Sequence, residues 1–110
     1  MRPVLGLVEK VVFVADKDRK FTARIDTGAT MSSIDHDLVS NLHLESVLSR
    51  KKIRSAHGVQ ERSMIRATVI LKKKMITGLF TVARRTHMTY PVLIGQNILK
   101  KGEFIVDPLK

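Results

Sequence analysis

The chain has 110 residues, of which 44% are hydrophobic and 27% charged, as expected for one globular domain over residues 1–110. It contains no cysteine, which excludes disulfides, thiolate zinc sites, iron–sulfur clusters and a cysteine nucleophile. We expect no signal peptide and no membrane association, because no apolar run reaches the roughly 18 residues of a spanning helix; this predicts a cytoplasmic location. The net charge of +10 favours anionic partners, whereas an aromatic content of 5% disfavours a base-stacking nucleic-acid surface.

The first half of the chain is expected to form a hairpin followed by a short helix. Residues 4–14 are rich in valine and residues 20–25 alternate between apolar and polar side chains, so both segments are predicted strands, joined by a turn at 16–18. Asp35 is suited to cap a helix of about two turns that ends near Leu42.

The second half is predicted to consist mainly of short strands. They are expected near residues 51–56, 62–72, 75–83, 91–94 and 104–106. Turns are predicted at residues 57–58 and at the lysine run 72–74, and Gln96 or Asn97 is expected to cap a helical turn that stops at Gly102. Many short strands with one or two short helices predict a mainly β protein that folds as a small closed β-barrel.

The sharpest local motif is the segment Ile25-Asp26-Thr27-Gly28-Ala29-Thr30, in which a carboxylate follows an apolar strand and precedes a glycine. A simple interpretation is a turn in which Asp26 accepts backbone N–H bonds and Gly28 adopts a positive φ. A second segment, Val92–Leu99, combines an apolar strand, a glycine and a polar start of a helix.

Together the two segments resemble the retropepsin class of aspartic proteases. The resemblance implies that Asp26 is the catalytic carboxylate and that Thr27 braces the two loops across a dimer. It also implies that Gly28 brings a backbone amide close to the substrate and that Gly95 packs beneath the loop. The residues that support the active-site loop are then Thr27, Gly28, Ala29 and Gly95.

The similarity extends over residues 4–108 to a cellular branch, the bacterial and archaeal retropepsin-like proteins labelled ATP-dependent zinc proteases. It is carried by Arg85–Gly95, Phe104–Pro108, Ala23–Ala29 and Gly58–Arg62. That branch often occurs alongside ATP-grasp ligases that append glutamates to proteins, so the resemblance implies a link to such a ligase pathway and to acidic tails.

The chain itself predicts neither a metal nor another cofactor. It has no His-Glu-x-x-His and no phosphate-binding glycine motif, and the cluster Asp35-His36-Asp37 would point its side chains to different helix faces. A serine nucleophile is also not predicted, because Ser32 and Ser33 lack the Gly-x-Ser-x-Gly elbow and are expected to form local loop or cap hydrogen bonds.

A single Asp-Thr-Gly predicts a homodimer. Hydrolysis by carboxylates requires one ionised and one protonated group, which two carboxyls about 3 Å apart provide by sharing one proton. Since the chain carries one such motif, Asp26 of each copy should meet its twin on a two-fold axis.

Two features depart from the retroviral pattern. Thr30 and Gln96 stand where retroviral members typically carry an acidic residue and an arginine of an interface ion-pair network. The predicted flap around residues 55–62 has one glycine where the retroviral flap tip is glycine-rich, and its tentative substrate-binding residues are His57, Gly58 and Val59.

The leading hypothesis is therefore a homodimeric retropepsin-like aspartic endopeptidase that acts on peptides, with the positive charge favouring acidic ones. One alternative is a non-catalytic module of the same fold that binds extended peptides by strand addition. The other is a basic nucleic-acid-binding small β-barrel, which the charge favours and the low aromatic content disfavours.

Overall fold

The computed structural model describes residues 1–15, 17–44, 49–55, 58–85 and 87–110, and it confirms the predicted mainly β architecture. The elements in chain order are β1 (Val4–Leu5), β2 (Val8–Phe13), β3 (Arg19–Ile25), β4 (Ser32–Asp35), α1 (His36–Asn41), β5 (Ser49–Ser55), β6 (Gly58–Leu71), β7 (Lys74–Ala83), β8 (Val92–Ile94), α2 (Gln96–Lys101) and β9 (Ile105–Val106).

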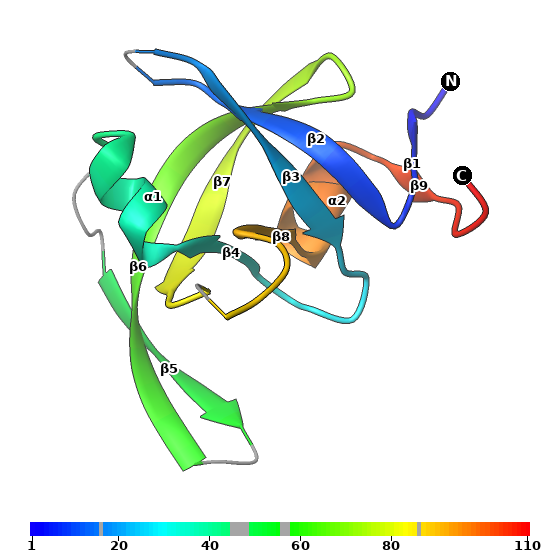
Figure 1. The fold of residues 1–110 in the computed structure, drawn as a ribbon. Helices are drawn as coiled ribbons and strands as arrows, with labels where there is room; N and C mark the ends of the chain where they lie inside the picture. The colour runs from blue at the N-terminus through cyan, green and yellow to red at the C-terminus, as the bar shows by residue number, and fades with distance from the viewer. Residues whose placement is uncertain (16, 45–48, 56–57, 86) are drawn as a thin grey trace.

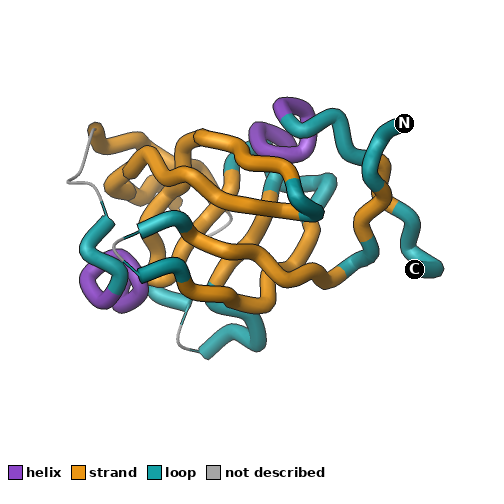
Figure 2. Tube along the Cα trace, turned by 90° about the horizontal axis from the view of Figure 1, so that it is seen from above, coloured by secondary structure: helices purple, strands orange, loops and turns teal. Residues whose placement is uncertain are grey.

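The main sheet closes into a barrel, as the sequence predicted (Figure 1). Its strands follow the order β2-β3-β8-β4-β7-β6, and β6 pairs again with β2 through Val12↔Ile70 and Phe13↔Val69. Figure 2 shows the two helices at opposite ends of this barrel, with both chain termini at the end where α2 lies. Closure leaves the barrel strands without a long free edge.

Apolar side chains from all sides fill the barrel. Within β3, Ala23 and Ile25 are buried while Arg24 is exposed, which is the alternation that the sequence predicted. Phe13 and Phe80, both fully buried, place their ring centroids 5.4 Å apart at the centre.

A long hairpin of β5 and β6 extends from the barrel on the side where the loop after β3 and the connection between β7 and β8 also lie (Figure 1). Its outermost described pair is Ser55↔Gly58, and Gly58 has a φ of 110°, which favours glycine. The hairpin is thus where the sequence predicted a flap. Of the predicted flap residues, His57 lies outside the described part of the chain.

The predicted strand 4–14 is wrong in its extent, because the strand is interrupted at Gly6. The Gly6 N–H donates to Glu9 Oε2 at 2.7 Å. The part before the break, β1, leaves the barrel and pairs in parallel with β9, through Val4↔Ile105 and Leu5↔Val106. A valine-rich segment is compatible with one long strand or with two shorter ones. The pairing of β1 with β9, which is distant in sequence, selects two strands.

The strand β4 was not predicted. Its polar-looking sequence Ser32-Ser33-Ile34-Asp35 lies wholly buried between β7 and β8. The expectation of a local loop role for Ser32 and Ser33 is therefore wrong. The helix that follows is as predicted, since Asp35 caps it by accepting the N–H of Asp37 at 3.2 Å.

The lysine run forms the turn that the sequence predicted. Lys72 and Lys73 have φ values of 49° and 66° between the paired residues Leu71 and Lys74, as a tight hairpin requires. In the part of the chain that the structure describes, neither helix has the length and apolar character needed to cross a bilayer.

Candidate active site

Asp26 stands where two central barrel strands end together. β3 and β8 run in parallel, with Ile25 opposite Ile94, and the Asp26 N–H donates to the Ile94 carbonyl at 2.9 Å. Asp26 is half-buried, whereas its neighbour Ile25 is almost fully buried. The barrel core therefore anchors the backbone of Asp26 and leaves its carboxylate at the surface of the barrel end.

Short hydrogen bonds hold the loop that Asp26 begins. Its Oδ1 accepts the N–H of Gly28 at 2.9 Å, and its carbonyl accepts the N–H of Ala29 at 3.3 Å. The turn interpretation thus describes the hydrogen bonding correctly. It is wrong about Gly28, because Gly58 is the one glycine with a positive φ among the described residues. A Cβ at Gly28 would lie 3.3 Å from Asp26 Oδ1, so glycine leaves space beside the carboxylate.

Gly95 lets the second segment pack directly on this loop. A Cβ built at Gly95 would lie 2.5 Å from the Met31 carbonyl oxygen and 2.8 Å from that of Ala29. Beyond Gly95, the Gln96 N–H donates to the Ala29 carbonyl at 2.8 Å and the Asn97 N–H donates to that of Thr30 at 3.2 Å. The first turn of α2 thus uses N–H groups that have no partner within the helix to hold the Asp26 loop.

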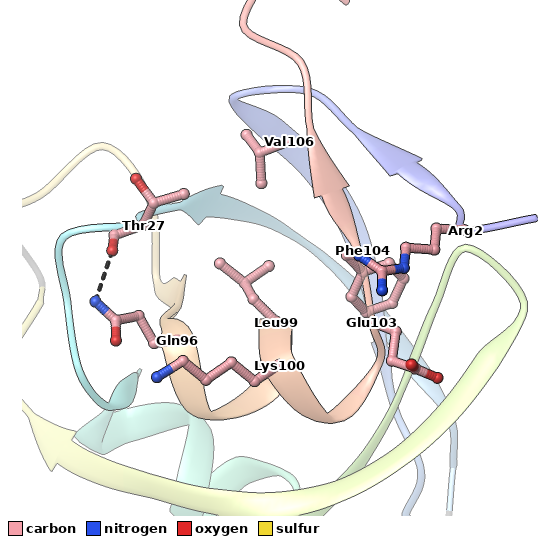
Figure 3. A pocket seen from close by; sticks show the side chains of 8 residues that line it. All are labelled: Arg2, Thr27, Gln96, Leu99, Lys100, Glu103, Phe104 and Val106. Atoms are coloured by element: carbon pink, nitrogen blue, oxygen red, sulfur yellow. Dashed lines mark hydrogen bonds between the residues drawn. The ribbon is translucent and has the colours of Figure 1, made fainter.

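The polar side chains of α2 continue this contact. Gln96 Nε2 donates to the Thr27 carbonyl at 2.8 Å, as Figure 3 shows. The Asn97 amide bridges β4 and β7, since its Oδ1 accepts from the N–H and the hydroxyl of Ser32 and its Nδ2 donates to the Leu79 carbonyl. The expectation that Gln96 or Asn97 caps α2 is therefore wrong. Gly95 occupies the N-cap position without a side-chain bond.

Ser32 is central to this arrangement. Its Oγ accepts the buried N–H of Gly95 at 2.9 Å and donates to Asn97 Oδ1 at 2.8 Å. Sequence reasoning missed both Ser32 and Asn97 as site-supporting residues. The available signal was a pair of serines directly after the Asp-Thr-Gly loop, which is equally typical of an exposed turn.

Adjacent serines of β4 provide a matched test. We expect Ser32→Ala to lower the free energy of unfolding by about 1–3 kcal/mol, because it leaves buried donors and acceptors unpaired. Ser33 is also buried, but its hydroxyl has no hydrogen-bond partner among the described residues, so Ser33→Ala should be neutral or slightly stabilising. Urea denaturation of both variants checks this, and equal losses would contradict the assigned role of Ser32.

A cavity of about 590 Å³ lies next to the loop, on the face formed by α2, β9 and the N-terminal segment (Figure 3). Its lining residues are Arg2, Thr27, Gln96, Leu99, Lys100, Glu103, Phe104 and Val106. Thr27 is exposed at its edge. The face that carries the cavity therefore continues directly into the Asp26 loop.

The structure brings most of the predicted site residues together. The pairing of β3 with β8 places the loop of Asp26, Thr27, Gly28 and Ala29 against Gly95. Gly58 and Val59 lie apart from them at the end of the β5–β6 hairpin, where Val59 is 58% exposed.

No group of three potential metal-ligating side chains occurs among the described residues. In the cluster that the sequence singled out, Asp35 is buried and accepts backbone N–H bonds from Asp37 and Arg85. His36 and Asp37 are exposed, with His36 Nδ1 3.4 Å from Asp37 Oδ1. Asp35 thus holds backbone N–H groups, while His36 and Asp37 contact each other at the surface.

Known structures share this fold. A Legionella pneumophila subsp. pneumophila (strain Philadelphia 1) protein of unknown function, Lpg0085, superposes with a TM-score of 0.71 at 19% identity, covering 100% of this chain and 96% of its own. The simian foamy virus (mac) protease superposes with a TM-score of 0.65 at 15% identity, over 84% of this chain and 91% of its own. No curated protein sequence matches the chain significantly.

The sequence also matches a family model over residues 35–110, a range that begins after the Asp26 loop and includes Gly95 and α2. That model describes RimB-like proteins, under the heading retropepsin-like aspartic endopeptidase RimB. The match covers more than half of the chain, and the barrel agrees with that of a retropepsin-like protease. The chain therefore belongs to the RimB-like family of retropepsin-like aspartic endopeptidases.

Proposed function

We propose that the protein is an aspartic endopeptidase that works as a homodimer, with Asp26 of each copy contributing one carboxylate to a shared catalytic pair. The observation that carries this proposal is the position of Asp26, whose backbone is bonded to Ile94 where two barrel strands end while the residue itself stays half-exposed. The proposed support of the loop comes from Thr27, Gly28, Ala29 and Gly95.

The chemistry follows from two carboxyls that share one proton. The ionised carboxylate takes a proton from water, and the oxygen of that water attacks the peptide carbonyl carbon. The protonated carboxyl donates to the carbonyl oxygen, and a proton then passes to the leaving nitrogen as the C–N bond breaks. Because the two groups interact strongly, their protonation steps belong to the pair and not to either Asp26 alone.

The proposed dimer uses the face that carries the cavity in Figure 3. A two-fold axis beside Asp26 must bring a second copy against the neighbouring Thr27. The Gln96 amide is already bonded to the Thr27 carbonyl of its own chain, so it orders the loop from within one subunit.

The edge of β9 on this face offers a further contact. The N–H groups of Ile105 and Asp107 donate inward to the carbonyls of Pro3, just before β1, and of Leu5 in β1. This pairing turns the peptide groups of Val106 outward. A second copy can therefore pair with β9 without exchange of the terminal strands, because β1 and β9 pair within one chain.

The proposed substrate is an extended peptide held between the Asp26 loop and the β5–β6 hairpin, with Gly58 and Val59 close to it. The role of His57 in substrate binding stays a prediction. The net charge of +10 supports acidic peptides as the preferred class. The link to an ATP-grasp ligase pathway and the cytoplasmic location also stay predictions.

The test is cleavage of a degenerate peptide pool enriched in acidic residues, between pH 4 and 8, over a dilution series in which sedimentation measures the dimer fraction. We expect the activity per chain to fall with the dimer fraction, because a single copy holds half of the catalytic pair. Activity that persists in a fully monomeric sample would overturn the shared site. A dimer that binds the peptides without cleaving them would favour a peptide-binding module.

A further inference from the structure

A second cavity, of about 300 Å³, lies between β3 and the connection that leads from β7 to β8. Its lining residues are Arg24, Arg85, His87, Met88, Thr89 and Tyr90. Two of these residues are arginines and none is acidic. The cavity is thus built to attract an anion.

Arg24 places this cavity beside the candidate catalytic residue. Ala23 and Ile25 of β3 are buried in the core, and side chains alternate along a strand. Asp26 directly follows β3 and continues its pairing with Ile94, so Arg24 and Asp26 lie on the side away from the core. Two residues of an extended strand span about 6.6 Å. One extended peptide can therefore reach both Asp26 and this cavity.

Arg85 is the unusual residue of the cavity, because it is only 9% exposed. Its backbone N–H donates to Asp35 Oδ1 at 2.7 Å, and its Nε donates to the Tyr90 carbonyl at 3.0 Å. The first bond holds the backbone of Arg85, and the second holds its guanidinium. They leave its terminal nitrogens without a protein acceptor among the described residues, and Arg85 is one of the residues that line the cavity.

No carboxylate among the described residues forms an ion pair with the Arg85 guanidinium. Asp35 accepts backbone N–H bonds, and neither of the ion pairs found within the described ranges includes Arg85. Burial lowers the pKa of Arg85, Asp35 opposes this effect, and the nearby Arg62 of β6 lowers the pKa further. A buried cation without a close partner is costly, and a carboxylate from a bound molecule would compensate for it.

We propose that this cavity binds the side-chain carboxylate of an acidic residue in the substrate, with Arg85 as its main ligand and Arg24 as a second cation at the entrance. A guanidinium presents paired N–H groups that match the two oxygens of a carboxylate. The assignment rests on the proposed function, in that the acidic residue must belong to a peptide lying along Asp26. It goes beyond net charge, since it names the two side chains that bind the acidic residue of the substrate.

The experiment measures binding to the Asp26→Asn variant, so that no turnover complicates it. The probes are two fluorescent peptides, one with three consecutive glutamates and one with glutamines at the same positions, followed by anisotropy at constant salt. We expect the glutamate peptide to bind more tightly than the glutamine peptide. The preference, defined as the ratio of their two Kd values, should fall by roughly 10- to 100-fold in Arg85→Gln or Arg24→Gln.

Arg84→Gln is the matched control, because Arg84 is exposed on the same connection, does not line the cavity and carries the same charge. It should leave the preference unchanged. If Arg84→Gln lowers the preference as much as Arg85→Gln and Arg24→Gln do, bulk charge explains the binding and the proposal is wrong. If circular dichroism shows that Arg85→Gln is unfolded, Arg24→Gln decides the question.

Two further outcomes separate this inference from the proposed function. Cleavage by the wild type with equal kcat/KM for both peptides would overturn the carboxylate site and leave the peptidase intact. Binding that depends on Arg85 without any cleavage by the wild type would support the site and contradict the peptidase. If a single-stranded oligonucleotide of equal charge binds more tightly and is sensitive to the same variants, the cavity binds phosphate and the proposed carboxylate ligand is wrong.

Discussion

Asp26→Asn is expected to reduce peptide cleavage by roughly 10²- to 10⁴-fold, because the amide can neither take a proton from water nor share one with its twin. The fold should be retained, since the Asn oxygen can still accept the Gly28 N–H that Asp26 Oδ1 accepts. Initial rates on a peptide that the wild type cleaves, measured with the dimer fraction at the same concentration, check this expectation.

Asp37→Asn is the matched control for this variant. Its side chain is 67% exposed on α1, and the substitution removes the same charge without affecting the Asp26 loop. We expect wild-type rates. An equal loss of activity in both variants would contradict a catalytic role for Asp26.

Mixing the wild type with an excess of the Asp26→Asn chain tests the shared site directly. If subunits exchange freely, only dimers of two wild-type chains keep the pair of carboxylates, so activity should fall with the square of the wild-type fraction. A linear fall would mean that each chain acts alone.

Gly95→Ala should have the second largest effect, on stability and on activity together. The new Cβ would lie 2.5 Å from the Met31 carbonyl oxygen, and backbone cannot move aside as the end of a side chain can. The φ and ψ of Gly95, −102° and −171°, are open to any residue, so the cost is steric. We expect a loss of about 1–3 kcal/mol, or roughly 5–20 °C in melting temperature, and displacement of the Asp26 loop.

Gly78→Ala provides the comparison. A Cβ there would lie 2.5 Å from Cδ1 of Ile98, which is the end of a flexible side chain. Thermal unfolding at one fixed protein concentration should therefore show a clearly smaller loss for Gly78→Ala. Equal losses would mean that close backbone packing at Gly95 is not what holds the loop.

Much of the barrel was predictable because its signals are local. The alternation in residues 20–25 predicts which side of β3 is buried, and Asp35 caps the helix that follows it. The resemblance of the two segments around Asp26 and Gly95 to retropepsins implied a common site, in which Gly95 permits a close backbone approach. The structure places that glycine against Ala29 and Met31.

The buried polar contacts were not predictable in the same way. A Ser-Ser pair is typical of exposed turns, and β4 is a strand because β7 and β8 pair with its two edges and Asn97 accepts the Ser32 groups. The bond from Gln96 to Thr27 likewise joins residues far apart in the chain. Each of these contacts depends on strand pairing that no local pattern encodes.

By itself, therefore, the sequence determined that the protein is a mainly β barrel with one Asp-Thr-Gly loop and a basic surface, since these properties follow from alternation, local motifs and counted charges. Only the tertiary structure decided that the first strand is interrupted near Gly6 and that Ser32 supports the Asp26 loop. It also decided that Arg85, one arginine among many, is buried beside β3 and has no ion-pair partner within the described ranges. Burial and partnership are properties of the assembled fold: Arg84, which precedes Arg85 in the chain, is exposed.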